Sequence, residues 1–73
     1  MTTSESWLQA FADRLGTAVP SDQEVLDILE LAGCAAHGSQ RTAAPVACWL
    51  AATEGLSPAA ALQIARQLVV AED

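Results

Sequence analysis

Glycine, serine and proline divide this chain into four short segments, and the apolar residues of each segment recur with the period of a helix. The first segment spans residues 4–15 and is followed by Gly16, a residue type that readily adopts a left-handed helix cap. The second begins after Ser21 and has Glu24 three positions later, which is the pattern of a capping box. It is predicted to continue to residue 36 or 37.

The other two segments are bounded in the same way. Residues 42–54 form a third helical segment, which Gly55 ends. Ser57 followed by Pro58 is a typical N-cap and first helical residue, and this pair opens a fourth segment that is predicted to run to about Ala71. Four helical segments predict an all-α fold, and the short connectors between them predict a compact four-helix domain.

Composition supports the same fold class. The chain has 73 residues, which is enough for one small domain over residues 1–73, and 16 of them are alanine. One Phe, two Trp and no Tyr are present, so the aromatic residues that strands favour are scarce. Small side chains let helices approach closely, and Gly33 inside the second segment is expected at such a crossing. The large apolar residues expected in one core are Trp7, Phe11, Leu15, Ile28, Leu29, Val46, Trp49, Leu50, Leu62 and Val69.

Charge argues against two classes of partner. Nine acidic residues oppose three basic ones, giving a net charge of −6. Binding to nucleic acid without sequence preference requires a basic face that replaces counterions, and an anionic membrane surface requires the same. Neither nucleic acid nor a membrane is therefore expected as a partner.

The distribution of cysteines and apolar residues favours a cytoplasmic protein. No segment has the charged and then apolar pattern of a secretory signal, and no uncharged run is long enough to span a bilayer. Cys34 and Cys48 lie in apolar helical segments, where free thiols act as small apolar side chains. No close pair of Cys or His has the spacing of a zinc site, so neither a metal nor a cofactor is expected.

Two helical segments carry more apolar surface than a single core contact needs. Residues 43–52 hold no charged side chain, which favours a central position for the third helix. The fourth segment has only a narrow polar stripe. Part of its remaining surface is a candidate contact for a partner protein or a second copy, with Ala60, Ile64 and Ala71 as the predicted partner-binding residues.

The connector between the second and third segments collects groups that could bind an anion. It leads into a helix N-terminus, where free N–H groups and the helix dipole favour negative charge. Arg41 offers a bidentate donor, Ser39 and Thr42 offer hydroxyls, and His37 adds a second cation when protonated. These four residues are the predicted ligand-binding set, with a phosphate or carboxylate group as the ligand.

The same residues also have a purely structural interpretation. Thr42 would be the N-cap of the third helix, Arg41 would pair with one of the acids, and His37 would complement the dipole at the end of the second helix. Catalysis has little support. Cys34 lies one turn before His37, but no third group orients the imidazole, and so short a chain does not enclose a substrate.

A set of short motifs in the middle of the chain carries a resemblance. The motifs are Ala35-Ala36-His37, Arg41, Ala43-Ala44-Pro45 and Trp49-Leu50. They resemble the signature of a small actinobacterial helical domain family of unknown function. That family occurs alone and at the C-terminus of proteins similar to molybdenum cofactor guanylyltransferase. The chain departs from the family at Trp49, where Phe is usual, and at Ala52, near which the family has a Gly.

The resemblance implies an association with molybdopterin nucleotide chemistry and no activity of its own. We therefore expect a non-enzymatic accessory or binding module. It would contact either a molybdenum-cofactor nucleotidyltransferase or the phosphate end of that enzyme's ligand, the latter through the connector at residues 37–42. The alternative is a protein–protein interaction domain that binds no small molecule and uses the fourth helix, either to form a homodimer or to dock a partner helix.

Overall fold

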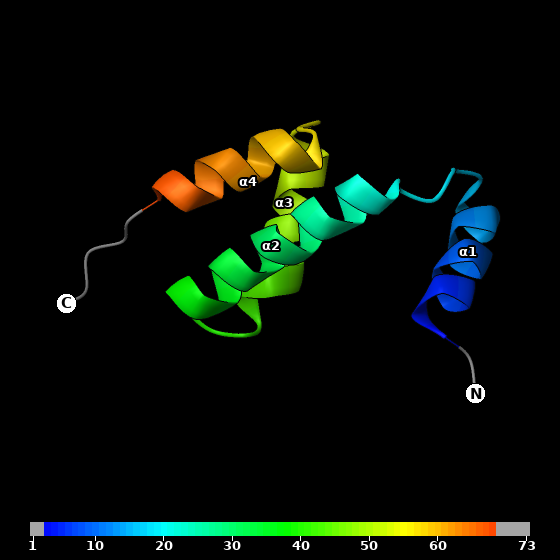
Figure 1. Ribbon diagram of the computed structural model, residues 1–73, viewed down its shortest axis with the longest axis horizontal. Coiled ribbons are helices and arrows are strands. Elements are labelled where there is room, and N and C mark those ends of the chain that lie inside the picture. The colour runs from blue at the N-terminus through cyan, green and yellow to red at the C-terminus, as the bar shows by residue number, and fades with distance from the viewer. Residues whose placement is uncertain (1–2, 69–73) are drawn as a thin grey trace.

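The computed structural model describes residues 3–68, which form an all-α domain of four helices (Figure 1). The helices are α1 (Ser4–Leu15), α2 (Asp22–Gly38), α3 (Ala43–Thr53) and α4 (Pro58–Gln67). The predicted fold class is confirmed, and the first three helices lie where the sequence predicts them. The fourth is shorter than predicted, because Leu68 has extended backbone angles (φ −77°, ψ 121°) and α4 ends before it.

Local hydrogen bonds explain why the helices begin and end at these residues. At the start of α2, the Ser21 Oγ accepts a bond from Glu24 N (3.1 Å), while Glu24 Oε1 accepts one from Ser21 N (2.8 Å). This is the predicted capping box. At the end of α1, Gly16 has the left-handed conformation (φ 76°), and Thr17 N donates to the Ala12 carbonyl (3.0 Å). The ends of these helices are therefore set by their own sequence.

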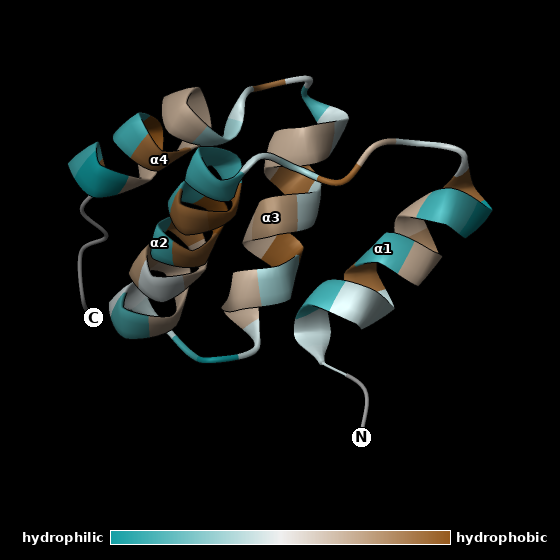
Figure 2. Ribbon diagram, turned by 45° about the vertical axis from the view of Figure 1, so that its right-hand side comes forward, coloured by the Kyte–Doolittle hydropathy of each residue, from teal (hydrophilic) through white to brown (hydrophobic). Residues whose placement is uncertain are grey.

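The central helix is α2. It lies between α3 and α4 (Figure 2) and packs against both of them. Residues 43–52 were predicted to form the central helix because they carry no charge, and this prediction is wrong. Within the described residues, the extensive contact of α3 is with α2 alone. The lack of charge on α3 therefore does not result from burial on all sides.

The core is small and consists mostly of small side chains. Leu31 of α2 and both Ala61 and Leu62 of α4 are its buried members. Around them lie partly buried side chains, which are Cys34, Cys48, Ala51, Leu56 and Ala65. Alanine and cysteine therefore fill most of the contact between helices, so α3 adds no large side chain to the core.

Most of the large apolar side chains that were predicted for the core are at the surface instead. Leu62 is buried, Ile28 is partly buried, and Val69 lies outside the described residues. The exposed members of the predicted set are Trp7, Phe11, Leu15, Leu29, Val46, Trp49 and Leu50. The reason is geometric. A helix with a fixed period buries one side, and on α3 that side holds the small residues.

Truncating Leu62 should destabilise the fold far more than truncating Leu26. Leu62 is 4% exposed and Leu26 is 55% exposed, so the two substitutions to Ala remove the same atoms from opposite environments. We expect Leu62→Ala to lower the free energy of unfolding by about 2–5 kcal/mol. Leu26→Ala should lower it by about 1 kcal/mol or less. Urea denaturation of both variants measures the difference, and equal losses would contradict the core described above.

Gly33 does not mark a close helix crossing, contrary to the prediction. A Cβ built at this position would meet no atom within 4 Å beyond the backbone of its own helix. Gly33→Ala should therefore raise the free energy of unfolding by about 0.5–1 kcal/mol, because alanine restricts the unfolded chain and favours the helix. Gly16→Ala is the matched control and should be destabilising, since the φ of Gly16 is positive. A loss of thermal stability in Gly33→Ala would show that a neighbour approaches α2 there.

Candidate functional site

The two sides of α3 have opposite character. The side toward α2 is made of small, partly buried residues, which are Ala44, Ala47, Cys48 and Ala51. The side away from α2 carries Val46, Trp49 and Leu50, all more than half exposed, with Trp49 at 70%. No charged residue occurs anywhere in α3. We call the side formed by Val46, Trp49 and Leu50 the outward α3 face.

A second apolar strip lies on α1. It consists of Trp7, Leu8, Phe11 and Leu15, which share one side of the helix and are all exposed. The rings of Trp7 and Phe11 lie with their centroids 5.1 Å apart. Leu8 lines an open cavity of about 660 Å³ between α1 and the start of α2, so α1 is not packed tightly there. These four residues are the α1 stripe.

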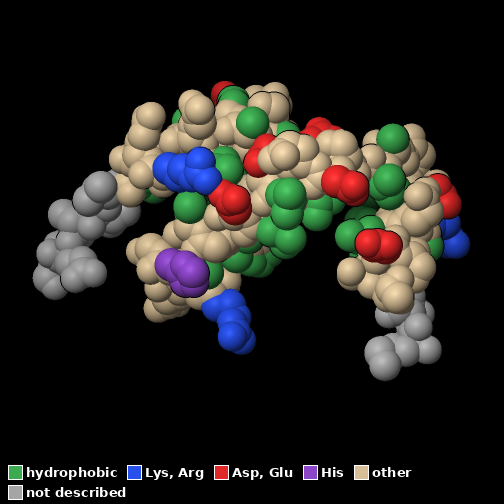
Figure 3. Space-filling view, viewed as in Figure 1, with side chains coloured by type: hydrophobic (Ala, Val, Ile, Leu, Met, Phe, Trp, Pro, Cys, Tyr) green, Lys and Arg blue, Asp and Glu red, His purple; other side chains and the backbone are tan. Residues whose placement is uncertain are grey.

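The α1 stripe and the outward α3 face together form the α1–α3 surface. In Figure 3 apolar side chains, in green, gather below α2 and on the side of α1 that faces it. α1 makes no extensive contact with α3. Neither face is therefore covered by the other within the described chain.

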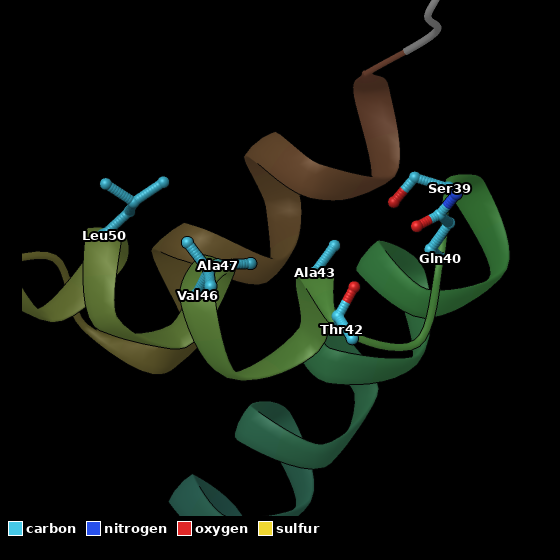
Figure 4. Close-up of a pocket in the computed structure, with 7 residues that line it drawn as sticks. All are labelled: Ser39, Gln40, Thr42, Ala43, Val46, Ala47 and Leu50. Carbon is cyan, nitrogen blue, oxygen red and sulfur yellow. The ribbon is translucent and has the colours of Figure 1, made fainter.

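The predicted ligand-binding residues are brought together on the α2–α3 turn. His37 lies in the last turn of α2, and Ser39, Arg41 and Thr42 follow before α3 begins; all four are exposed. A shallow groove of about 620 Å³ starts at this turn and continues along α3; Figure 4 shows the residues that line it. Its lining residues are Ser39, Gln40, Thr42, Ala43, Val46, Ala47 and Leu50. One groove thus connects the polar turn with the outward α3 face.

The two hydroxyls of the turn are in different situations. Ser39 Oγ donates a 2.7 Å hydrogen bond to the Ala35 carbonyl at the end of α2. The Thr42 side chain forms no capping hydrogen bond, and the backbone of Thr42 is helical (φ −66°, ψ −17°). The structural interpretation predicted that Thr42 caps α3 through its side chain, and this prediction is wrong.

The backbone donors at the start of α3 are largely occupied. Ala43 N donates to the Gln40 carbonyl (2.9 Å) and Ala44 N donates to the Arg41 carbonyl (3.1 Å). Pro45 follows and has no N–H. The expectation of free N–H groups is wrong for these positions, because the chain enters α3 through a tight turn. An anion at this end of α3 would depend on the side chains of Arg41 and His37.

Arg41 forms no ion pair with any residue in the range 3–68. The ion pair present in that range joins Arg66 of α4 to Glu30 of α2. Both partners of that pair are more than half exposed, so it adds about 1 kcal/mol at most. The ion pair with an acid that the structural interpretation predicted for Arg41 is therefore absent from residues 3–68.

The remaining candidates do not form an assembled reaction centre. Cys34 and Cys48 are free thiols and partly buried. Cys34 and His37 line one cavity of about 500 Å³ between α2, α3 and α4. Over residues 3–68, no group of three His, Cys, Asp or Glu side chains could hold a metal ion. None of the helices in that range has both the length and the apolar character that crossing a membrane requires.

On α4, two of the three predicted partner-binding residues can be placed. Ala60 and Ile64 are exposed, whereas Ala71 lies outside the described residues. Ile64 shares its helix with the paired Arg66 and with buried Leu62. The sequence reasoning missed the outward α3 face instead. The signal for it was available, because small residues recur on the side of α3 opposite Val46 and Trp49.

Replacing Arg41 by Gln should leave the free energy of unfolding unchanged within about 0.5 kcal/mol, because the side chain is exposed and makes no ion pair in the described chain. The anion contact is tested separately by titrating wild type with inorganic phosphate and following the amide shifts of residues 38–44. If Arg41 binds the anion, the shifts should shrink in Arg41→Gln. Shifts that are absent, or equal in both proteins, would contradict the contact.

No curated protein and no protein of solved structure matches this chain. Residues 1–72 match a protein family that is described as Domain of unknown function (DUF6457). The match covers nearly the whole chain, including all four helices and both apolar faces. The chain therefore belongs to the DUF6457 family.

Proposed function

We propose that this chain is a non-enzymatic accessory module that works in the cytoplasm by binding another protein through the α1–α3 surface. The observation that carries the proposal is the outward α3 face, where Val46, Trp49 and Leu50 are exposed and no charge is present. Contiguous exposed apolar patches on small domains mark sites of protein contact. Tryptophan is also among the residues that contribute most to the energy of such contacts.

The lack of an assembled catalytic group in residues 3–68 supports the non-enzymatic part of the proposal. The imidazole of His37 is exposed, and the cavity that it shares with Cys34 is lined otherwise by apolar residues, a glycine and one serine. A nucleophile needs a base held by a third group, and none is present at that cavity.

The resemblance of the central motifs supports a narrower proposal about the partner. The spacing of His37, Arg41 and Pro45 resembles that of an actinobacterial family joined to proteins similar to molybdenum cofactor guanylyltransferase. We therefore propose a molybdenum-cofactor nucleotidyltransferase as the partner. Molybdopterin nucleotide metabolism is the proposed setting.

The α2–α3 turn is a second candidate contact, for a phosphate group of the nucleotide that such an enzyme handles. The exposed side chains of His37 and Arg41 support it, as does the groove that joins the turn to the outward α3 face. A protein that covers Val46 would also lie beside Thr42. Both contacts can therefore belong to one complex.

Val46 and Ile64 provide a matched pair of variants for testing which helix binds the enzyme. Both are β-branched, and they are 57% and 58% exposed, on α3 and α4 respectively. Calorimetric titration of the purified nucleotidyltransferase with Val46→Glu should show binding weakened at least tenfold, about 1.4 kcal/mol, because a carboxylate would be buried in an apolar contact. Ile64→Glu should bind like wild type.

The other results of this titration discriminate between the candidates. A loss of binding in Ile64→Glu alone would favour docking through α4, which is the alternative that the sequence suggested. A loss in Arg41→Gln alone would favour the turn. No binding by wild type would contradict the proposed partner.

A further inference from the structure

We propose that in the free protein a second copy of this chain covers the α1–α3 surface, with the α1 stripe of each copy lying on the outward α3 face of the other. The inference rests on the proposed function, because it names the occupant of the surface that is assigned there to protein binding. Exposed area, charge, the position of α1 and the complementarity of the two faces all support this arrangement.

The exposed area exceeds what a folded monomer of this mass requires. The chain of 7.6 kDa exposes 6088 Å², whereas a typical folded monomer of that mass exposes about 4,300 Å². The difference is about 1,800 Å² per copy, and a stable interface of standard size buries about 800 Å² per partner. The surplus surface is thus large enough for a stable dimer.

Charge restricts where two copies can meet. Each copy carries a net charge of −6, so two copies repel each other over most of their surfaces. The acidic residues of the described helices lie on α1 and α2, whereas α4 carries only Arg66 and α3 carries no charged residue between Ala43 and Thr53. A second copy can cover the outward α3 face without removing a charge from water.

The connector between α1 and α2 separates the α1 stripe from α3 of its own chain, with which α1 makes no extensive contact. Its two ends are fixed by hydrogen bonds, from Thr17 N to the Ala12 carbonyl (3.0 Å) and from Ser21 N to Glu24 Oε1 (2.8 Å). Pro20 stands between these ends, and its ring restricts the backbone further. The stripe is therefore available to another molecule.

The two faces suit a reciprocal exchange. The α1 stripe offers the paired rings of Trp7 and Phe11, and the outward α3 face offers Val46 and Trp49. In a two-fold symmetric pair, each copy supplies one stripe and one face, so both faces of both copies are covered at once. Such a pair is closed, whereas a head-to-tail arrangement would continue into a filament.

Light scattering on the full chain over a range of concentrations tests the proposal. Wild type should show twice 7.6 kDa, and added salt should favour this state because it screens the repulsion between the copies. Val46→Glu and Phe11→Lys should each weaken association at least tenfold, while Ile64→Glu should not. All three side chains are exposed, so circular dichroism should show that the helices are retained.

Mixing two of these variants separates the exchanged dimer from other dimers. In a mixed pair of Phe11→Lys and Val46→Glu, one contact joins an unchanged α1 stripe to an unchanged α3 face. The other contact places the new lysine beside the new glutamate. The mixture should therefore form more dimer than either variant does alone. A dimer built on α3 against α3 would show no such recovery.

Four results would overturn the proposal. The first is a wild-type monomer whose tryptophans are quenched by iodide, and the second is a monomer whose tryptophans are protected from iodide. The third is a dimer that is lost only in Ile64→Glu. The fourth is a dimer that mixing Phe11→Lys with Val46→Glu does not restore. The first leaves the proposed function intact if the nucleotidyltransferase still binds and Val46→Glu abolishes that binding. The second means that α1 closes onto its own α3, and it overturns the proposed function as well.

Discussion

The close contact between α2 and the small side chains of its two neighbours is the constraint on which the structure depends. Cys48 and Ala51 of α3 and Ala61 of α4 fill the space that larger residues occupy in most helical domains. Small residues permit close approach, but each one buries little apolar area. Within residues 3–68, Leu31 and Leu62 are therefore the only large side chains buried in the core, and a domain of this size has little stability in reserve.

This constraint also determines what the surface is made of. A helix turns by about 100° per residue, so small residues on the inward side of α3 place Val46 and Trp49 on the other. The chain is rich in apolar residues, and an inward side that accepts only small ones leaves the large ones exposed. The α1–α3 surface is thus the counterpart of the alanine-rich core. Covering it would add the apolar burial that the core does not supply.

The helices could be predicted from the sequence, but which helices pack against each other could not. Helix ends depend on local chemistry, so the capping box at Ser21 and the left-handed Gly16 could be inferred from adjacent residues. Apolar periodicity shows which residues share a side, but it does not show which side faces inward. That is why Trp49 was placed in the core and why α3, not α2, was expected at the centre.

The candidate site shows the same division between local and distant information. The sequence predicted an exposed connector near His37 and Arg41, and in the structure His37 lies in the last turn of α2 while residues 39–42 form the exposed turn. That the N–H groups of Ala43 and Ala44 are occupied depends on the path of the turn, which residue types alone do not define. The groove leading from the turn to Val46 depends on the orientation of α3 relative to α2, which is a property of packing.

The placement of charge links this packing to function. Among the described helices, α1 and α2 carry the acidic residues and α4 carries only Arg66, whereas α3 carries no charge at all, although its outward face is exposed to water. A solvent-facing helix in an acidic protein gains solubility from charge, so an uncharged and apolar exposed face needs a physical reason. Burial against α2 does not supply it, since α2 covers only the opposite side. The proposed contact with another protein would supply it, because any charge on that face would have to lose its water when a partner binds.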